Sequence, residues 1–88
     1  MKLSPEQCRA ARGLVDWTQD HLAAEAGVSR STVRDFESRR HLIQKSTEGQ
    51  LLSALEAAGV IFLDPDADGP GVRLRLSSDR PQSGPAAD

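Results

Sequence analysis

The stretch QDHLAAEAGVSRSTVRDFES, residues 19–38, holds two short helix patterns separated by a glycine. Thr18 stands before the first pattern and Ser29 before the second, and both side chains can cap a helix N-terminus. Gly27 lies between the patterns, where the chain needs a left-handed turn that glycine adopts at least cost. Ala23 has to be small because the two helices cross at that point. These residues predict two short helices joined by a tight turn.

Such a pair is the helix-turn-helix pattern, in which the second helix enters the major groove of double-stranded DNA. The first helix is expected over 19–26 and the second over 30–40. The side that faces the rest of the fold is apolar and consists of Leu22, Val28, Val33 and Phe36. The opposite side of the second helix is polar throughout and consists of Arg30, Ser31, Arg34, Asp35 and Ser38. We expect this polar face to meet the base edges.

The start of the chain predicts another helix. In LSPEQC, Ser4 and Gln7 form a capping box, with a proline at the first helical position between them. Leu3 and Cys8 take the two positions of a hydrophobic staple. The apolar spacing that follows carries this helix to about Val15.

A loop over 40–46 is expected to separate the helix-turn-helix unit from a fourth helix. Thr47 and Gln50 form a second capping box at the start of that helix. The apolar run that follows ends at Gly59, a typical helix stop.

After this helix come a short apolar run, Val60–Leu63, and a segment in which apolar and polar residues alternate, Val72–Leu76. The two segments predict an antiparallel hairpin. The last residues are polar and rich in proline and glycine. The fold is therefore predicted to be mainly α, a four-helix helix-turn-helix DNA-binding domain with a short C-terminal β-hairpin. The domain is expected over 1–59, the hairpin over 60–76 and a disordered tail over 77–88.

Charge is distributed unevenly along the chain. The formal net charge of −2 alone argues against a nucleic-acid partner, but the first 45 residues carry eight Lys/Arg against six Asp/Glu. The face that carries the cations therefore matters more than the total. Nine of the eleven basic residues are arginine. This suits phosphate and guanine recognition, although GC-rich coding gives the same ratio.

Several classes of protein are disfavoured. Cys8 is the only cysteine, so no internal disulfide can form, and no apolar run approaches the roughly 20 residues of a membrane span. The N-terminus also lacks the apolar core of a signal peptide. We expect a soluble cytoplasmic protein, associated with the nucleoid through its DNA, with no membrane partner.

A known family shares the pattern of the central segment. The residues in register are Gln19, Leu22-Ala23, Gly27-Val28-Ser29, Val33, Phe36-Glu37 and the capped fourth helix. Over about residues 4–60 the chain resembles the Cro/repressor-type (XRE) helix-turn-helix regulators. It departs from many members in having a hairpin in place of a fifth helix, and Ser38 where they have glycine.

The resemblance implies roles for individual residues. Gln19 would contact a phosphate, whereas Arg30, Ser31 and Asp35 would read bases. Arg12 of the first helix would form a partly buried ion pair with Glu37, the alternative being two separate surface charges.

The arginines of the polar face admit more than one partner. Arg30 can fork to a guanine, worth about 1–3 kcal/mol of discrimination. Arg34 lies on the same base-reading face, where a backbone phosphate is its better partner. Asp35 either accepts from a cytosine amine or pairs with Arg39 one turn later, and we favour the pair. The simplest alternative is a solvated helix face.

Contacts to the sugar-phosphate backbone position a protein on DNA without reading its sequence. We expect them from the ends of the two helices and the loop that follows. The residues concerned are Gln19, Ser29, Thr32, Ser38, Arg39, Arg40, His41 and Lys45.

Other kinds of site are not favoured. DPDADG, residues 64–69, matches the start of a calcium-binding loop, but the twelfth position is Arg75 and not glutamate. We therefore expect an acidic turn, with no metal and no cofactor. Cys8 lies on an apolar helix face and is expected to be a packed thiol and not a redox sensor. Because no nucleophile, base and orienting group come together, we do not expect an enzyme.

The second strand of the hairpin raises the question of a dimer. Val72, Leu74 and Leu76 share one face of an exposed edge strand. Pairing with the same strand of a second copy would give a twofold homodimer. Alternatively, these side chains fold back on the fourth helix of their own chain.

We therefore predict a sequence-specific, double-stranded DNA-binding transcriptional regulator that acts as a homodimer and as a repressor. The alternative is a protein-interaction module, such as a toxin-neutralising antitoxin, for which DNA binding is secondary. In that case the hairpin and the acidic C-terminal half would hold the protein partner.

Overall fold

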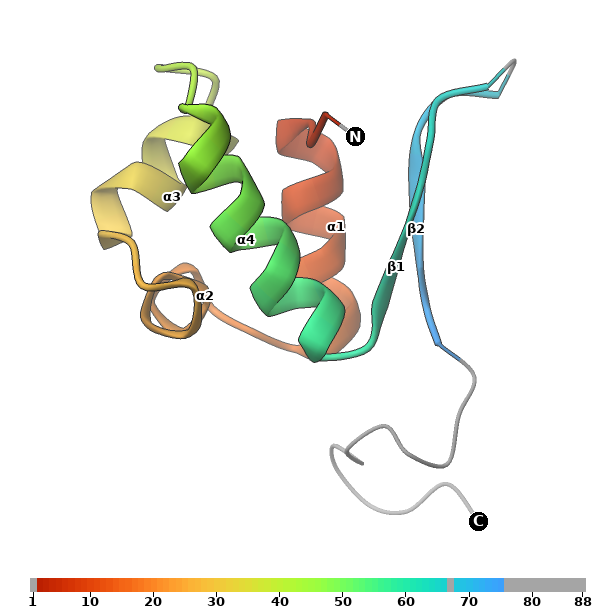
Figure 1. Cartoon of the computed structure of the whole chain (residues 1–88), viewed down its shortest axis with the longest axis horizontal. Coiled ribbons are helices and arrows are strands. Elements are labelled where there is room, and N and C mark those ends of the chain that lie inside the picture. Colours follow the sequence, from red (N-terminus) through yellow and green to blue (C-terminus); the bar gives the residue numbers. More distant parts are fainter. Residues whose placement is uncertain (1, 67, 76–88) are drawn as a thin grey trace, which may run out of the picture.

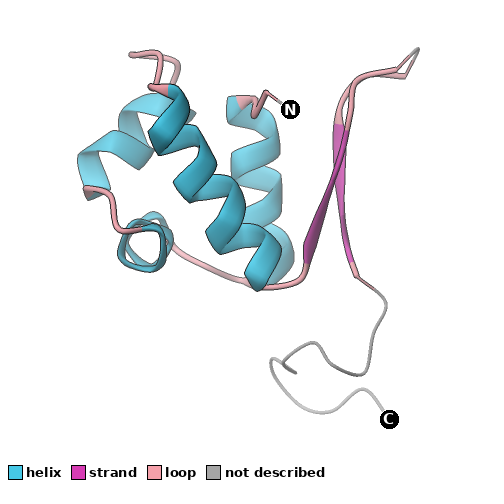
Figure 2. Cartoon of the chain, in the orientation of Figure 1, coloured by secondary structure: helices cyan, strands magenta, loops and turns pink. Residues whose placement is uncertain are grey.

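The computed structural model describes residues 2–66 and 68–75. Four helices are followed by a two-stranded antiparallel hairpin (Figures 1 and 2). In chain order they are α1 (Pro5–Val15), α2 (Gln19–Ala26), α3 (Arg30–Glu37), α4 (Lys45–Ala57), β1 (Val60–Leu63) and β2 (Gly71–Leu74). The predicted fold class, mainly α with a C-terminal hairpin, is confirmed. The tail over 77–88 lies outside the described residues.

Helix α1 begins as the sequence predicts. The Ser4 side chain accepts from the Gln7 backbone N–H at 3.0 Å, and the Gln7 side chain accepts from the Ser4 N–H at 3.0 Å. Leu3 and Cys8 are both buried, as the staple positions require. The chain leaves the helix through Asp16, which adopts a left-handed conformation.

The core lies where the four helices and the first strand meet. Helix α2 packs on both α3 and α4, and α1 packs on α3 and on the hairpin. The buried apolar residues are Leu3, Cys8, Ala11, Leu22, Ala23, Ala26, Val33, Phe36, Leu51, Leu55 and Val60. The core is almost entirely aliphatic because the chain has so few aromatic residues.

The hairpin lies beside α1, on the opposite side of the molecule from α3 (Figures 1 and 2). Phe62 pairs with Val72, and both pack against the core. The Gln7 side chain donates to the carbonyl oxygens of Leu63 and Gly71 at 3.2 and 3.1 Å, tying both strands to α1. The sequence pattern predicted that Gln7 caps α1, but it did not predict the hydrogen bonds of Gln7 to the hairpin.

Strand β2 is shorter than predicted. It runs over Gly71–Leu74 and not over 72–76, and Leu76 lies outside the described residues. Gly71 joins the strand because it pairs with Leu63 at the turn end of the hairpin. At the other end the Arg75 N–H donates to the Gly59 carbonyl at 2.7 Å.

The prediction that the third helix continues to residue 40 is wrong. Helix α3 ends at Glu37, and Arg39 has a left-handed backbone with φ of 64°. The Arg39 N–H donates to the Phe36 carbonyl and the Arg40 N–H to the Asp35 carbonyl, at 3.0 and 2.8 Å. This pair of bonds is a Schellman motif, in which an arginine takes the place usually held by glycine.

The predicted start of the fourth helix is also wrong. Helix α4 begins at Lys45, after Gln44, which makes no side-chain capping bond. Thr47 and Gln50 therefore lie inside the helix and form no capping box. A tertiary contact accompanies the earlier start, because Glu48 in the first turn accepts from the Leu3 N–H at 2.8 Å.

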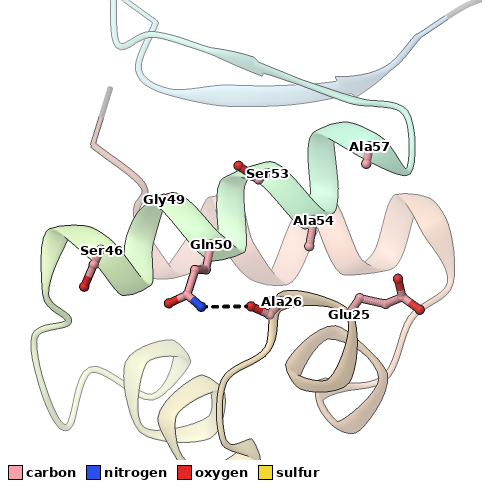
Figure 3. Close-up of a pocket in the computed structure, with 8 residues that line it drawn as sticks. All are labelled: Glu25, Ala26, Ser46, Gly49, Gln50, Ser53, Ala54 and Ala57. Carbon is pink, nitrogen blue, oxygen red and sulfur yellow. Dashed lines mark hydrogen bonds between the residues drawn. The ribbon is translucent and has the colours of Figure 1, made fainter.

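A groove of about 550 Å³ separates parts of α2 and α4. Its walls on α4 are mostly small side chains such as Ser46, Gly49 and Ser53 (Figure 3). Gln50 crosses the groove and donates to the Ala26 carbonyl at 3.3 Å (Figure 3). This bond helps to fix the end of α2, and therefore the turn that leads into α3.

Within the described part of the chain, every helix is too short or too polar to cross a bilayer.

Candidate functional site

The turn between α2 and α3 has the geometry that its glycine predicts. Gly27 has φ of 73°, and the Val28 N–H donates to the Ala23 carbonyl at 3.0 Å. Ala23 is buried where α2 meets its neighbours. The turn therefore sets the direction in which α3 leaves α2.

Hydroxyl groups close the N-terminal end of α3. The Ser29 side chain accepts from the Thr32 N–H at 3.1 Å, the predicted cap. The same oxygen lies 2.7 Å from the Thr32 hydroxyl and 3.1 Å from that of Ser31. Helix α3 has no acidic residue in its first turn. An anion that approaches this end therefore meets hydroxyls and the positive end of the helix dipole.

The outer face of α3 is open to solvent. Arg30, Ser31, Arg34 and Ser38 are exposed, and Asp35 is half-buried. On the inner face Val33 and Phe36 are buried, and Val28 in the preceding turn packs against the core. The helix thus separates its polar and apolar sides as the sequence predicts.

Three arginines in and just after α3 have a carboxylate partner, namely Arg30, Arg34 and Arg39. An Arg30 Nη1–Asp20 Oδ2 distance of 3.4 Å links α3 to α2, and Arg34 Nε lies 3.4 Å from Asp35 Oδ1. Arg39 pairs with Glu6 of α1. The favoured Asp35–Arg39 pair is therefore wrong. The Schellman turn gives Arg39 a left-handed backbone and breaks the helical spacing on which that prediction rested.

The C-terminal end of α3 is anchored in the interior through Glu37. Arg12 holds this carboxylate at two points, with Nε–Oε2 and Nη2–Oε1 distances of 2.8 and 2.7 Å. The Cys8 thiol donates to Oε2 at 3.0 Å, and the Gln19 amide donates to Oε1 at 3.0 Å. Arg12 and Glu37 thus form the ion pair that the resemblance implies, within a larger network.

This network shifts the titration of its members. Burial by itself raises the pKa of Glu37, but hydrogen bonds from Arg12, Cys8 and Gln19 outweigh it and lower that pKa below its ordinary value. The hydrogen bond with Glu37 raises the pKa of Arg12. Burial, followed by the hydrogen bond to Glu37, raises the pKa of the Cys8 thiol far above its ordinary value. Cys8 is therefore a packed thiol and not a reactive thiolate.

Gln19 and Arg39, both expected at phosphates, are each bonded to a carboxylate of the protein itself. The Gln19 side chain is half-buried and donates to Glu37. Arg39 is occupied by Glu6, whose pKa is lowered chiefly by that hydrogen bond. Each would have to share or exchange its partner to hold a phosphate.

The loop after α3 is the more open part of the site. Arg40 and His41 of this loop are exposed, and so is Lys45, the first residue of α4. His41 also borders a hollow of about 230 Å³ that Ser31, Thr32 and Asp35 line from α3. The loop and the outer face of α3 therefore form one continuous surface.

Asp20 is a site residue that the sequence interpretation missed. It lies in the first turn of α2 and contacts Arg30 ten residues later, on another helix. No helical or strand spacing connects these two positions. Only the placement of α3 against α2 brings them together.

Comparison with known proteins agrees with this geometry. A family model described as helix-turn-helix matches residues 9–57, which include α2, the turn, α3 and α4. A search of curated proteins gave no match. The matched family consists of DNA-binding proteins and is not a family of enzymes. With more than half of its length matched, the chain belongs to the Cro/repressor-type (XRE) family of helix-turn-helix DNA-binding transcription regulators.

Proposed function

We propose that this protein is a sequence-specific transcriptional repressor that binds double-stranded DNA as a homodimer. Helix α3 lies in the major groove, and its outer face reads base edges. The single observation that carries this proposal is the exposed polar face of α3, fixed to the core by the buried Glu37 network at its far end.

Arg30, Ser31, Arg34 and Asp35 are the proposed base-reading residues. Arg30 is the first residue of α3, so its side chain is at the end of the helix that enters the groove first. Bidentate contact of a guanidinium with guanine supplies about 1–3 kcal/mol of discrimination against the wrong base. Arg34 lies one helical turn after Arg30, and from there its guanidinium can bind a phosphate oxygen as well as a base.

Phosphate contacts flank this reading face on both sides. On one side are Gln19 at the start of α2 and the hydroxyls of Ser29 and Thr32. On the other side are Ser38, Arg39, Arg40, His41 and Lys45, most of them in the loop after α3. Helix N-termini and short loops of this kind hold phosphates through backbone N–H groups and side chains.

The proposed dimer forms through strand β2. Within the described residues β2 pairs only with β1, so its second edge is open to another strand. Val72 packs on the core of its own chain and Leu74 is half-buried. A second copy would therefore contact β2 mainly through backbone hydrogen bonds along its open edge. A twofold dimer that reads a palindrome has to present its two α3 helices to half-sites about 34 Å apart, or a multiple of that distance. A bound dimer represses by covering the DNA that polymerase needs.

Selection of duplexes from a random pool by the purified protein tests the proposal. We expect a palindrome with half-sites about 10 base pairs apart, whose binding weakens steeply with salt. Arg30→Ala should relax the preference at one base pair by about tenfold. Arg40→Ala should weaken all sequences alike and reduce the salt slope by about one.

Two controls accompany this experiment. Arg73→Ala removes an exposed arginine from the hairpin, on the opposite side of the molecule from α3, and should leave the sequence preference unchanged provided that the variant sediments as the wild type does. Sedimentation of the wild type and of Leu74→Asp tests the dimer, because a charge beside the paired edge should separate the subunits. Failure to enrich any sequence would refute specific recognition, and a wild type that sediments as a monomer with and without DNA would refute the dimer.

A further inference from the structure

Helix stability explains the position of Asp20 in its ion pair with Arg30, but it does not explain the position of Arg30. Arg30 is the first residue of α3, where the positive end of the helix dipole disfavours a cation. Asp20 is in the first turn of α2, where a carboxylate is favoured. The pair crosses from one helix to the other and lies on the outer surface beside the turn. Its position therefore points to a role for the Arg30 guanidinium outside the fold itself.

The contact occupies only part of the guanidinium. One nitrogen, Nη1, lies 3.4 Å from Asp20 Oδ2, and the two side chains are 69% and 64% exposed. A guanidinium has five N–H donors, and a guanine takes two of them in parallel. One edge of Arg30 can therefore rest on Asp20 while another edge faces a base.

The other two arginine pairs of the region differ in geometry. Arg34 contacts Asp35, the next residue of the same helix, so the contact adds no link between elements. Arg39 is held by Glu6 of α1, beyond the C-terminal end of α3. Only the Asp20 pair fixes a side chain at the leading end of α3 from a separate helix.

We infer that Asp20 is a positioning residue that sets the base specificity of Arg30, an inference that rests on the proposed function. The carboxylate restrains a long side chain that would otherwise sample many rotamers, so the free guanidinium edge is presented in the orientation that guanine requires. The same negative charge repels phosphates, so Arg30 gains little from DNA in which no guanine meets it. Asp20 thus raises discrimination while it lowers binding to DNA in general.

The test compares binding to two duplexes, the selected site and the same site with the base pair read by Arg30 exchanged. That base pair is identified beforehand as the position at which the Arg30→Ala variant no longer prefers one base over the others. Asp20→Asn should lower the ratio of the affinity for the selected site to the affinity for the exchanged site by roughly threefold to tenfold. This loss is part of the preference that one good base contact supplies. Its affinity for the exchanged site should rise, because one negative charge is lost near the phosphates.

Two further variants separate positioning from charge. Glu25→Gln removes one negative charge from the same helix, at a side chain that contacts His21 and not Arg30. It should leave the ratio unchanged. In the double variant Asp20→Asn with Arg30→Ala, the Asp20 change should have no further effect on the ratio, because Asp20 acts through Arg30.

The outcomes distinguish this inference from the function beneath it. If the wild type shows no sequence preference, the proposed function fails and the role of Asp20 fails with it. If the wild type discriminates but Asp20→Asn keeps the full ratio, only the role of Asp20 is refuted. An equal loss in Glu25→Gln would also refute it, because net charge would then explain the effect.

Discussion

The two ends of helix α3 are held in different ways. At the C-terminal end the Glu37 carboxylate is buried, with 2% of its side chain exposed, and receives hydrogen bonds from Arg12, Cys8 and Gln19. At the N-terminal end Arg30 meets Asp20 in an ion pair that is mostly exposed to water. The same eight-residue helix thus combines an interior anchor with a solvent-facing tip.

This contrast separates stability from recognition. A buried carboxylate that loses its cation is left with an uncompensated charge, which is strongly destabilising. An exposed pair contributes little to folding because water and salt compete for both charges. The exposed end is therefore free to contact DNA, while the anchor keeps the helix in place.

The largest effect is expected when the anchor is broken. Arg12→Met removes the guanidinium but keeps much of the apolar stem, and it leaves Glu37 buried without its cation. We expect the free energy of unfolding to fall by about 3 kcal/mol, as measured by urea titration followed by circular dichroism. Arg30→Met is the matched change at the exposed end and should stay within about 0.5 kcal/mol of the wild type. Equal losses in both variants would contradict the contrast between the two ends.

The next largest effect concerns the turn that places the N-terminal end of α3. Gly27→Ala forces a side chain into a backbone with φ of 73°, although the added Cβ would meet only Gln50 Nε2 at 3.7 Å. The cost is thus mainly backbone strain, about 1–2 kcal/mol. Gly13→Ala is the control, because this helical glycine has no atom within 4 Å of the added Cβ and should become more stable by about 1 kcal/mol. Thermal unfolding of both variants tests the opposite signs.

A smaller effect should follow from acidification of the anchor. Because the native pKa of Glu37 is lowered, the unfolded chain takes up its proton at a higher pH than the folded chain. The stabilisation is therefore present above the ordinary glutamate pKa of about 4.3 and is lost as the pH falls through the lower native value.

Urea titrations between neutral and acidic pH measure this loss. Glu37→Gln should flatten the acid limb of the stability profile relative to the wild type. Glu6→Gln is the comparison, because Glu6 is exposed and its pair with Arg39 is screened by water, so the profile should change less. An unchanged acid limb in Glu37→Gln would show that the anchor does not contribute to acid unfolding.

Local sequence signals predicted most of the fold. Ser4, Thr18 and Ser29 all cap helices as expected, and Gly27 makes the predicted left-handed turn. Each of these features depends on residues only a few positions apart, where backbone preferences and short hydrogen bonds decide the structure. The polar face of α3 was predictable for the same reason, because helical periodicity assigns its sides.

The errors arose where distant residues compete with local signals. Thr47 and Gln50 match a capping box, yet α4 begins earlier, where Glu48 receives the Leu3 N–H. Arg39 lies in a Schellman turn instead of continuing the helix, and its side chain pairs with Glu6 of α1. A local sequence pattern shows which conformations a segment favours, but tertiary contacts determine which of them the segment adopts.

The sequence by itself determined the helix-turn-helix unit, its caps, its glycine turn and the polar face of α3, because each follows from spacing within one or two turns. The resemblance implied the Arg12–Glu37 pair, but only the tertiary structure decided the other partners of the charged side chains that join separate elements. The buried Glu37 network joins α1, α2 and α3, the Asp20–Arg30 pair joins α2 to α3, and Gln7 joins α1 to both strands. Ion pairs and side-chain hydrogen bonds depend on distances of a few ångströms between separate elements, and those distances exist only once the helices have packed.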